Sequence, residues 1–296
     1  MVERDYATAT GLDVRLAARE GKHTGPTAGL APGFLQANLL VLPAEYADDF
    51  RRLCARNPVP CPLIGESSGP GIFDSVTGSA PRLSMATGCD LRTDIPAYMV
   101  YEDGRLVKSH SRDVQAEWTA RHVGFLIGCS YSFETALAAV GLRPRHVAQG
   151  RNVPMYRTTL ALMPAGKFTG ATCVVSMRAY RRREVDEVRR VTARFGATHG
   201  EPLAWGWEAV GRLGIRDVDE PEWGDAPLTE DGMPLGKRRR EGEGDGEEEE
   251  EEVPVFWGCG VTPQEAVMRA GLKGVVMAHA PGHMLVLDAK DEDIVG

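Results

Sequence analysis

The sequence predicts an α/β fold, because apolar strands lead through glycine turns into helices. Residues 123–127 form an apolar run without polar alternation, which is typical of a strand covered on both faces, and Gly128 and Cys129 follow it. The same design recurs 130 positions later, where the run 255–257 ends in Gly258 and Cys259. We therefore expect two strand-glycine-cysteine-helix junctions.

The residues that follow each glycine predict how the helices begin. Ser130 or Ser132 can cap the first helix, and Thr262 is expected to cap the second, with Glu265 closing a capping box. Unpaired N–H groups at such starts, including that of Gly260, favour anionic groups. The two junctions could face one pocket, although two ordinary turns without a ligand explain the pattern equally well.

The other elements follow from periodicity and turn residues. We expect a hairpin at 98–107 around Gly104, and a strand, a turn and a strand over 275–287. Helices are expected at 12–18, 43–56, 113–123 and 180–195, with Asn57 ending the second, and a strand at 172–177. Exposed loops are expected at 62–88 and turns at 196–227.

Size and composition indicate a globular protein with one large or two modest domains. The chain has 296 residues, of which 43% are hydrophobic and 26% charged. No apolar run approaches the roughly 20 residues that cross a bilayer. The acidic start, with Glu3 and Asp5, argues against a secretory signal, so we expect a cytoplasmic protein or, alternatively, one of the mitochondrial matrix.

Charge is concentrated in one polar segment. Residues 237–252 hold four basic and nine acidic residues, which leaves 30 basic against 33 acidic elsewhere. This near balance gives no reason to expect nucleic acid or a charged membrane as partner. We predict that 228–252 is a disordered acidic insertion, and we favour a solvated loop over an import signal for the basic run 237–240.

The six cysteines show neither disulfide nor zinc spacing, so reduced and mostly buried thiols are expected. Only Cys129 and Cys259 stand at expected helix starts, where a thiol pKa can be lowered and the thiolate can act as a nucleophile. His279 and His283 are four residues apart, but Pro281 and Gly282 exclude the helix that a metal site would need. One of the two could be a general base, and a structural histidine is an equal alternative.

The segment 150–158 has the highest density of polar candidates. Arg151 and Arg157 can bind carboxylates in a bidentate manner, and Asn152 and Tyr156 add neutral donors. The alternative is that these arginines pair with acidic residues across an interface. Arg92 and Asp94 have the same two interpretations.

At these motifs the chain resembles the D-glutamate cyclase family, whose bacterial members are known as hydro-lyases. Two polar segments depart from the family pattern, a longer loop at 64–88 and the insertion at 228–252. The matching blocks run in order along nearly the whole chain: GLAPGFLQANL at 29–39, RNPVPCPL at 56–63, DLRTDIP at 90–96, FLIGCSYSFE at 125–134, GRNVPMYRT at 150–158, VVSMR at 174–178, VPVFWGCGVTPQ at 253–264 and HAPGHML at 279–285.

The resemblance implies a three-layer αβα main domain with a smaller α+β domain, together forming one catalytic unit over 1–296. It also implies an enzyme that cyclises D-glutamate to 5-oxo-D-proline with loss of water. Because this amide forms within one molecule, the chemistry requires no ATP, redox cofactor or metal. A small carboxylic acid is the expected partner, and a homo-oligomer is compatible with the sequence.

The implied chemistry assigns roles to the candidates. Arg151 or Arg157 would hold a carboxylate, with Arg92, Arg178, Ser132, Asn152, Tyr156 and Thr262 as further binding residues. The N–H groups near Ser130 and Gly260 would stabilise the oxyanion. The base would be His283, His279, Glu134 or Asp94. Two alternatives remain: a hydro-lyase or cyclic-amide hydrolase for another small carboxylic acid, and a non-catalytic carboxylate-binding protein whose segment 228–252 recruits a basic partner.

Overall fold

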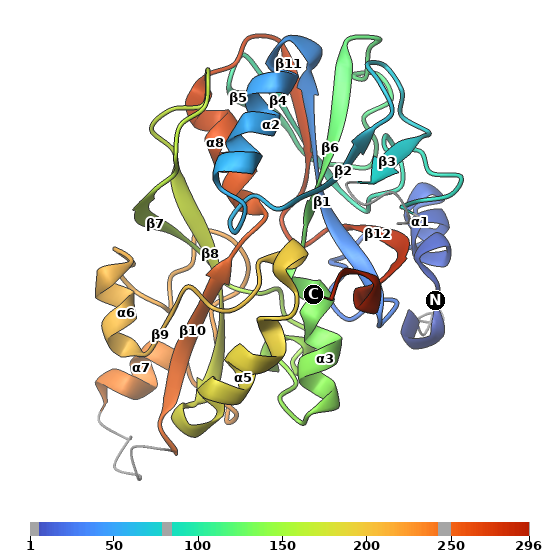
Figure 1. Cartoon of the computed structure of the whole chain (residues 1–296). Coiled ribbons are helices and arrows are strands. Elements are labelled where there is room, and N and C mark those ends of the chain that lie inside the picture. Colours follow the sequence, from blue (N-terminus) through green and yellow to red (C-terminus); the bar gives the residue numbers. More distant parts are fainter. Residues whose placement is uncertain (1–5, 79–84, 242–249, 296) are drawn as a thin grey trace.

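Two antiparallel sheets with helices packed against them make up the protein (Figure 1). The computed structural model describes residues 6–78, 85–241 and 250–295. In Figure 1 the larger sheet A occupies the upper right and the smaller sheet B the lower left. This mixture of helices and sheets is consistent with the predicted α/β class, while the three-layer arrangement and a separate smaller domain stay predictions.

Sheet A is organised around β1 (Phe34–Pro43). β6 pairs with β1 from Ala37 opposite Gly128 to Pro43 opposite His122, while β12 pairs with the first half of β1 and β11 with the second. The other strands of this sheet are β2 (Leu63–Ser67), β3 (Val76–Gly78), β4 (Tyr98–Glu102), β5 (Arg105–Ser111), β6 (His122–Gly128), β11 (Val275–His279) and β12 (Leu285–Lys290).

Sheet B has the order β7-β8-β10-β9. Its centre is the pairing of β10 with β8, which runs without interruption from Glu252 opposite Arg181 to Gly258 opposite Val175. The strands are β7 (Met155–Ala161), β8 (Thr172–Arg181), β9 (Ala204–Trp205) and β10 (Glu252–Gly258).

The apolar runs lie in strands buried on both faces, as predicted. In β6, Phe125 and Ile127 join an apolar cluster that continues into sheet B, whereas Leu126 joins a cluster on the opposite face of sheet A. Successive side chains of a strand alternate between faces, so a strand between two cores needs apolar residues throughout. The shared cluster joins the two sheets into one continuous core.

The helices cover both sheets. The predicted helices at 12–18, 43–56 and 180–195 and the two strand-turn-strand units are confirmed with small shifts of boundary. The α-helices are α1 (Gly11–Arg19), α2 (Ala47–Arg56), α3 (Glu134–Ala139), α4 (Arg145–Ala148), α5 (Val185–Thr192), α6 (Trp207–Arg212), α7 (Leu235–Arg240) and α8 (Val261–Ala270). Short 3₁₀ helices are η1 (Tyr6–Thr8), η2 (Ala44–Tyr46), η3 (Ser130–Phe133), η4 (Arg182–Glu184), η5 (Gly196–Thr198) and η7 (Asp291–Ile294).

The predicted helix at 113–123 is wrong. Side chains replace the helical hydrogen bonds there: Asp113 accepts from the Gln115 N–H, and the His122 ring accepts from the Thr119 N–H. Such local side-chain bonds compete with a helix. The predicted loops at 62–88 and 196–227 also contain structure, since β2 and β3 lie in the first and β9 and α6 in the second.

The prediction of disorder over 228–252 is wrong for both flanks of that segment, and residues 242–249 lie outside the described part of the chain. Leu235 is buried at the start of α7, and Glu252 begins β10. Arg240 binds Asp217 and Asp219 at 3.1 and 3.0 Å. Arg240 of the basic run is therefore paired with carboxylates of the fold, and composition alone does not reveal such pairing. None of the described helices is both long and apolar enough to span a membrane.

Candidate active site

The two glycine-cysteine junctions are neighbours, although they belong to different sheets. Cys129 after β6 and Cys259 after β10 lie in one apolar cluster. Asn38 of β1 donates to the carbonyl oxygen of Gly128 at 3.1 Å and lies against Gly260, where an added Cβ would come within 1.9 Å of its amide nitrogen. Gly260 is thus required for the close contact between the sheets.

The predicted helix caps are wrong. The Ser132 hydroxyl accepts from the Gln36 N–H at 3.1 Å, and the Thr262 hydroxyl bonds the N–H and the carbonyl oxygen of Val174 at 2.9 and 3.1 Å. Neither α3 nor α8 has a side-chain cap at its start. Buried backbone groups of the adjacent strands need partners, so these hydroxyls serve the strands instead of the helices.

Burial disfavours a thiolate nucleophile at both cysteines. Desolvation raises the pKa of the Cys129 thiol far above its ordinary value and raises that of Cys259 to about 11. The expectation of a lowered thiol pKa is wrong, since an apolar environment disfavours the charged thiolate.

Glu134 and Arg178 form a buried ion pair. The Arg178 Nε lies 3.0 Å from Glu134 Oε1, and its two terminal nitrogens donate to the hydroxyls of Ser130 and Ser176 at 3.0 and 2.9 Å. Burial opposes ionisation of Glu134, but His146 and Arg178 outweigh it and keep its pKa below the ordinary value. Glu134 stays ionised and paired, which makes it a poor base.

Three further candidates lie apart from the junctions and have structural partners. Asp94 binds Arg19 at 2.7 Å, Arg92 binds Asp90 at 2.8 Å, and the Tyr156 hydroxyl donates to the carbonyl oxygen of Val218. Arg92 and Asp94 are thus held in ion pairs, as in the alternative interpretation, although Arg92 pairs with a residue two positions away and not across an interface.

A cleft of about 640 Å³ brings three predicted residues together. Arg157 of β7, Asn152 before this strand and His283 before β12 line it, with Gln264 and Glu265 of α8. Residues of the β4–β5 hairpin also line the cleft, so both sheets contribute: Met99, Tyr101, Leu106 and His110. Concave sites with a few convergent polar groups are the usual binding sites of small molecules.

Arg157 is the cation of this cleft. Its Nε and Nη2 each lie 3.1 Å from an oxygen of Glu265, and the guanidinium carbon lies 4.6 Å from the centre of the Trp223 ring. The side chain remains 43% exposed, so a further donor group stays accessible. Trp223 is placed by pairing with Met155, whose N–H donates to its carbonyl oxygen at 2.9 Å.

His283 presents a neutral imidazole to the cleft. Its Nδ1 lies 3.1 Å from the carbonyl oxygen of Pro281. A carbonyl oxygen only accepts, so Nδ1 carries the hydrogen and Nε2 retains its lone pair. Burial lowers the pKa of His283 below its ordinary value. Its Nε2 can therefore accept a proton at neutral pH.

His279 has the same tautomer but a different position. Its Nδ1 lies 3.1 Å from the carbonyl oxygen of Leu39, and burial lowers its pKa to about 4. The ring is 1% exposed and is absent from the cleft lining. Of the two alternatives for this residue, the structural one describes its surroundings.

Asn152 is held by three contacts. The Tyr131 hydroxyl donates to its Oδ1 at 2.8 Å, and its N–H donates to Asp225 at 2.7 Å. Gly282 has φ of +87°, and an added Cβ there would lie 2.4 Å from Asn152 Nδ2. Arg151 instead donates to the carbonyl oxygen of Ala226 and does not line the cleft.

Several cleft residues were not predicted. Trp223, Asp225 and Gln264 lie in turns or on a helix face without a motif of their own, and Glu265 was assigned to a capping box. Tyr131 of η3 does not line the cleft but holds Asn152 there. The nearest signal was the placement of Tyr131 and Gln264 inside the matching blocks. Among the described residues, no group of three or more His, Cys, Asp or Glu side chains could hold a metal ion.

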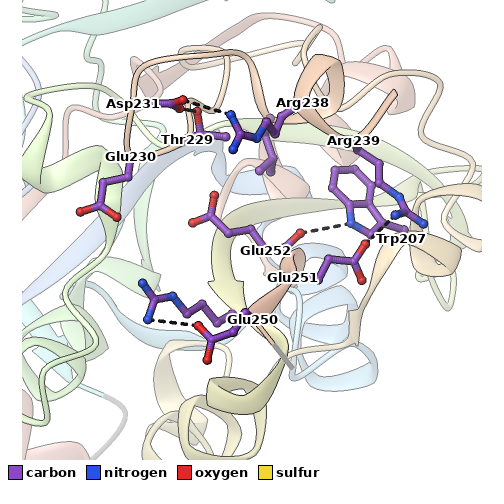
Figure 2. A pocket seen from close by; sticks show the side chains of 11 residues that line it. Trp207, Thr229, Glu230, Asp231, Arg238, Arg239, Glu250, Glu251 and Glu252 are labelled. Atoms are coloured by element: carbon purple, nitrogen blue, oxygen red, sulfur yellow. Dashed lines mark hydrogen bonds and ion pairs between the residues drawn. The ribbon is translucent and has the colours of Figure 1, made fainter. Parts of the chain in front are cut away.

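A second cavity, of about 540 Å³, lies beside the polar segment around α7 (Figure 2). Its charged groups largely neutralise one another: Arg239 binds Glu251 at 2.8 Å and Arg238 binds Asp231 at 3.1 Å. The Trp207 indole N–H donates to the carbonyl oxygen of Glu252. None of the predicted site residues lines it, so the cleft around Arg157 and His283 is the better candidate.

Comparison with known proteins supports the resemblance that the sequence motifs indicated. Residues 123–288 match the model of the D-glutamate cyclase family. A protein of Rubrobacter xylanophilus with the name "Putative hydro-lyase" is 47% identical over 95% of this chain and 96% of its own length. A protein of the fission yeast Schizosaccharomyces pombe with the name "Putative hydro-lyase C5H10.01" is 41% identical over 96% of this chain and 86% of its own length. These findings support an enzyme of the hydro-lyase class, and the chain belongs to the D-glutamate cyclase family.

Proposed function

We propose that this enzyme converts D-glutamate into 5-oxo-D-proline and water in the cleft between the two sheets. The observation that carries the proposal is the pairing, in one cleft, of an accessible guanidinium at Arg157 with a neutral imidazole at His283. A dicarboxylic amino acid needs both: a cation for a carboxylate and a base for its ammonium group.

The reaction forms one C–N bond and breaks one C–O bond. Arg157 holds the α-carboxylate, and His283 Nε2 accepts a proton from the ammonium group. The freed amine attacks the carbon of the γ-carboxylate, and a second proton passes from the nitrogen to one of its oxygens. The hydroxyl so formed leaves as water after taking up the first proton from the imidazolium. No oxidation occurs, so the atoms and charges balance within substrate, water and protein.

Neutral side chains complete the cleft. Gln264 donates to the Tyr101 hydroxyl at 3.1 Å, while its Oε1 is buried without a hydrogen-bond partner among the described residues. This oxygen can accept from the substrate ammonium. Asn152 Nδ2 makes only a long contact of 3.4 Å with Pro281 and can donate to the developing oxyanion. Ser130 and Gly260 do not line the cleft, which moves the oxyanion donor to Asn152.

Purified protein incubated with D-glutamate, L-glutamate and both enantiomers of 5-oxoproline provides the direct test. We expect interconversion of the D pair alone, followed by chiral chromatography or NMR. Turnover of a different carboxylic acid would replace the substrate and keep the hydro-lyase class. A rise in melting temperature with D-glutamate but no turnover would favour a carboxylate-binding protein and refute the proposal.

A further inference from the structure

A third cavity, of about 300 Å³, is lined by Tyr131, which bonds a residue of the cleft. It is formed by the loop 29–34, the start of α3 and the 3₁₀ helix η7, and it shares no lining residue with the cleft. Tyr131 lines this pocket while its hydroxyl donates to Asn152 in the cleft. Its volume is at the lower end of those of ligand sites.

Two buried carboxylates line the pocket, and each keeps one oxygen without a partner. Glu134 and Asp291 are 6% and 7% exposed. Among the described residues, Glu134 Oε2 and Asp291 Oδ1 have no hydrogen-bond partner, although the Asp291 carboxyl also interacts with Ser132. Buried polar atoms are nearly always bonded, so two orphaned acceptors at one pocket indicate a ligand that donates.

The rest of the lining specifies the ligand further. Leu30, Pro32, Phe34 and Val147 give apolar walls. At the mouth, the exposed Arg143 has no ion pair or hydrogen bond among the described residues. Its guanidinium matches a carboxylate. The orphaned carboxylate oxygens fit an ammonium group, the apolar walls fit an aliphatic side chain, and the free guanidinium fits a carboxylate.

We propose that this pocket is an accessory binding site for a small aliphatic α-amino acid. The ammonium group donates to Glu134 and Asp291, the side chain contacts the apolar walls, and the carboxylate binds Arg143. Charge-assisted hydrogen bonds from an ammonium group to buried carboxylates are the strong ones in such a site. The inference is independent of the reaction assigned to the cleft, because the two share no lining residue.

Calorimetry with three matched compounds tests the ligand class. Leucine carries both charged groups, 3-methylbutylamine lacks the carboxylate and 4-methylpentanoate lacks the ammonium group. We expect leucine to bind more tightly than 3-methylbutylamine by roughly tenfold, and 4-methylpentanoate not to bind at the same concentrations. Equal binding of leucine and 4-methylpentanoate, or no binding of leucine, would overturn the proposal.

Substitutions locate the ligand. Asp291→Asn should weaken leucine binding at least tenfold, because it removes a carboxylate from the ammonium site. Arg143→Gln should weaken leucine but not 3-methylbutylamine. The control Arg157→Gln, in the cleft, should leave the leucine dissociation constant unchanged. Leucine binding that survives Asp291→Asn but is lost in Arg157→Gln would place the ligand in the cleft instead.

The melting temperature of the Asp291→Asn variant checks that it folds. Burial disfavours the Asp291 charge and raises its pKa to about 7, so we expect a neutral amide of the same shape to be tolerated. D-glutamate turnover, measured separately, should persist in Asp291→Asn. Loss of turnover in this folded variant would place the reaction itself in this pocket and refute an accessory role, whereas absence of turnover in the unsubstituted enzyme would bear only on the cleft.

Discussion

At the scale of the residue, the neutral imidazole of His283 gives the cleft a proton acceptor. Its Nδ1–H is committed to the Pro281 carbonyl oxygen, and burial lowers its pKa. A base must be neutral to accept a proton, so we expect kcat/KM to rise with pH and to level off below pH 6.5, the ordinary value for histidine.

Replacing His283→Gln should lower turnover by at least tenfold, since positioned bases contribute about 10²–10⁴-fold. The acidic limb of the pH profile should disappear in the same variant. His110, whose ring centre lies 5.7 Å from that of His283, gives a matched control. If His110→Gln has the larger effect, the base has been assigned to the wrong histidine.

Arg157 is expected to act in substrate binding. Arg157→Gln should raise KM about tenfold or more, because a charged hydrogen bond to the substrate carboxylate is lost. Arg269 also bonds Glu265, at 3.3 Å, but does not line the cleft. Steady-state kinetics of Arg269→Gln should therefore match the unsubstituted enzyme, and an equal rise in KM would mean that Arg157 acts only by positioning Glu265.

The Glu134–Arg178 pair should matter most for stability. Glu134→Gln leaves the Arg178 charge, which is 2% exposed, without a counter-charge, at a cost of about 3–5 kcal/mol in the free energy of unfolding. Glu265→Gln weakens the pairing with Arg157 and Arg269, whose side chains are 43% and 47% exposed and can be solvated by water, so it should cost about 0–1 kcal/mol. Chemical denaturation measures both, and similar small costs would show that Arg178 is compensated by other groups.

At the scale of the element, the junctions depend on strand contacts and not on helix caps. Thr262→Val removes both bonds to Val174 and should cost about 1–3 kcal/mol, because the buried Val174 N–H loses its partner, while the carbonyl oxygen of Val174 keeps the bond from the Cys259 N–H. Thr262→Ser keeps the hydroxyl and should recover most of this loss. A valine variant as stable as the unsubstituted protein would show that water replaces the hydroxyl.

At the scale of the whole molecule, two buried neutral histidines link stability to pH. Burial lowers the pKa of His199 and of His279 to about 4, below the ordinary 6.5. The unfolded chain therefore binds more protons between these values, so the histidine contribution is full above pH 6.5 and is lost as the pH falls towards 4. The raised pKa of Asp291 has the opposite effect on stability, but it is one group against two, so the two histidines dominate the pH dependence of stability.

We expect the free energy of unfolding to decrease from pH 7 to pH 4.5, at roughly 1.4 kcal/mol per pH unit for each net proton taken up. Denaturant titrations over this range measure the slope. Substituting His199→Asn or His279→Asn should flatten the slope relative to the unsubstituted protein. A slope that neither variant changes would assign the acid sensitivity to other groups.

Local patterns determined the elements that depend on neighbouring residues alone. The two apolar runs, the hairpin around Gly104 and the amphipathic helices α2 and α5 were predictable, because burial on one or both faces leaves a period in the sequence. The motif blocks also led to the family, which similarity over most of the chain then showed.

The tertiary structure decided which polar group meets which. The sequence predicted Thr262 and Ser132 as helix caps. In the fold, their hydroxyls instead accept hydrogen bonds from the backbone N–H groups of Val174 in β8 and Gln36 in β1. Asp94 and Glu134 looked like bases until their arginine partners appeared. Hydrogen bonds and ion pairs form between residues up to hundreds of positions apart, and a single sequence carries no periodic signal for such pairing. The sequence alone therefore determined the strands and helices with a clear period and the family of this protein, whereas only the fold showed the elements inside the predicted loops and separated the cleft residues from the structural ones.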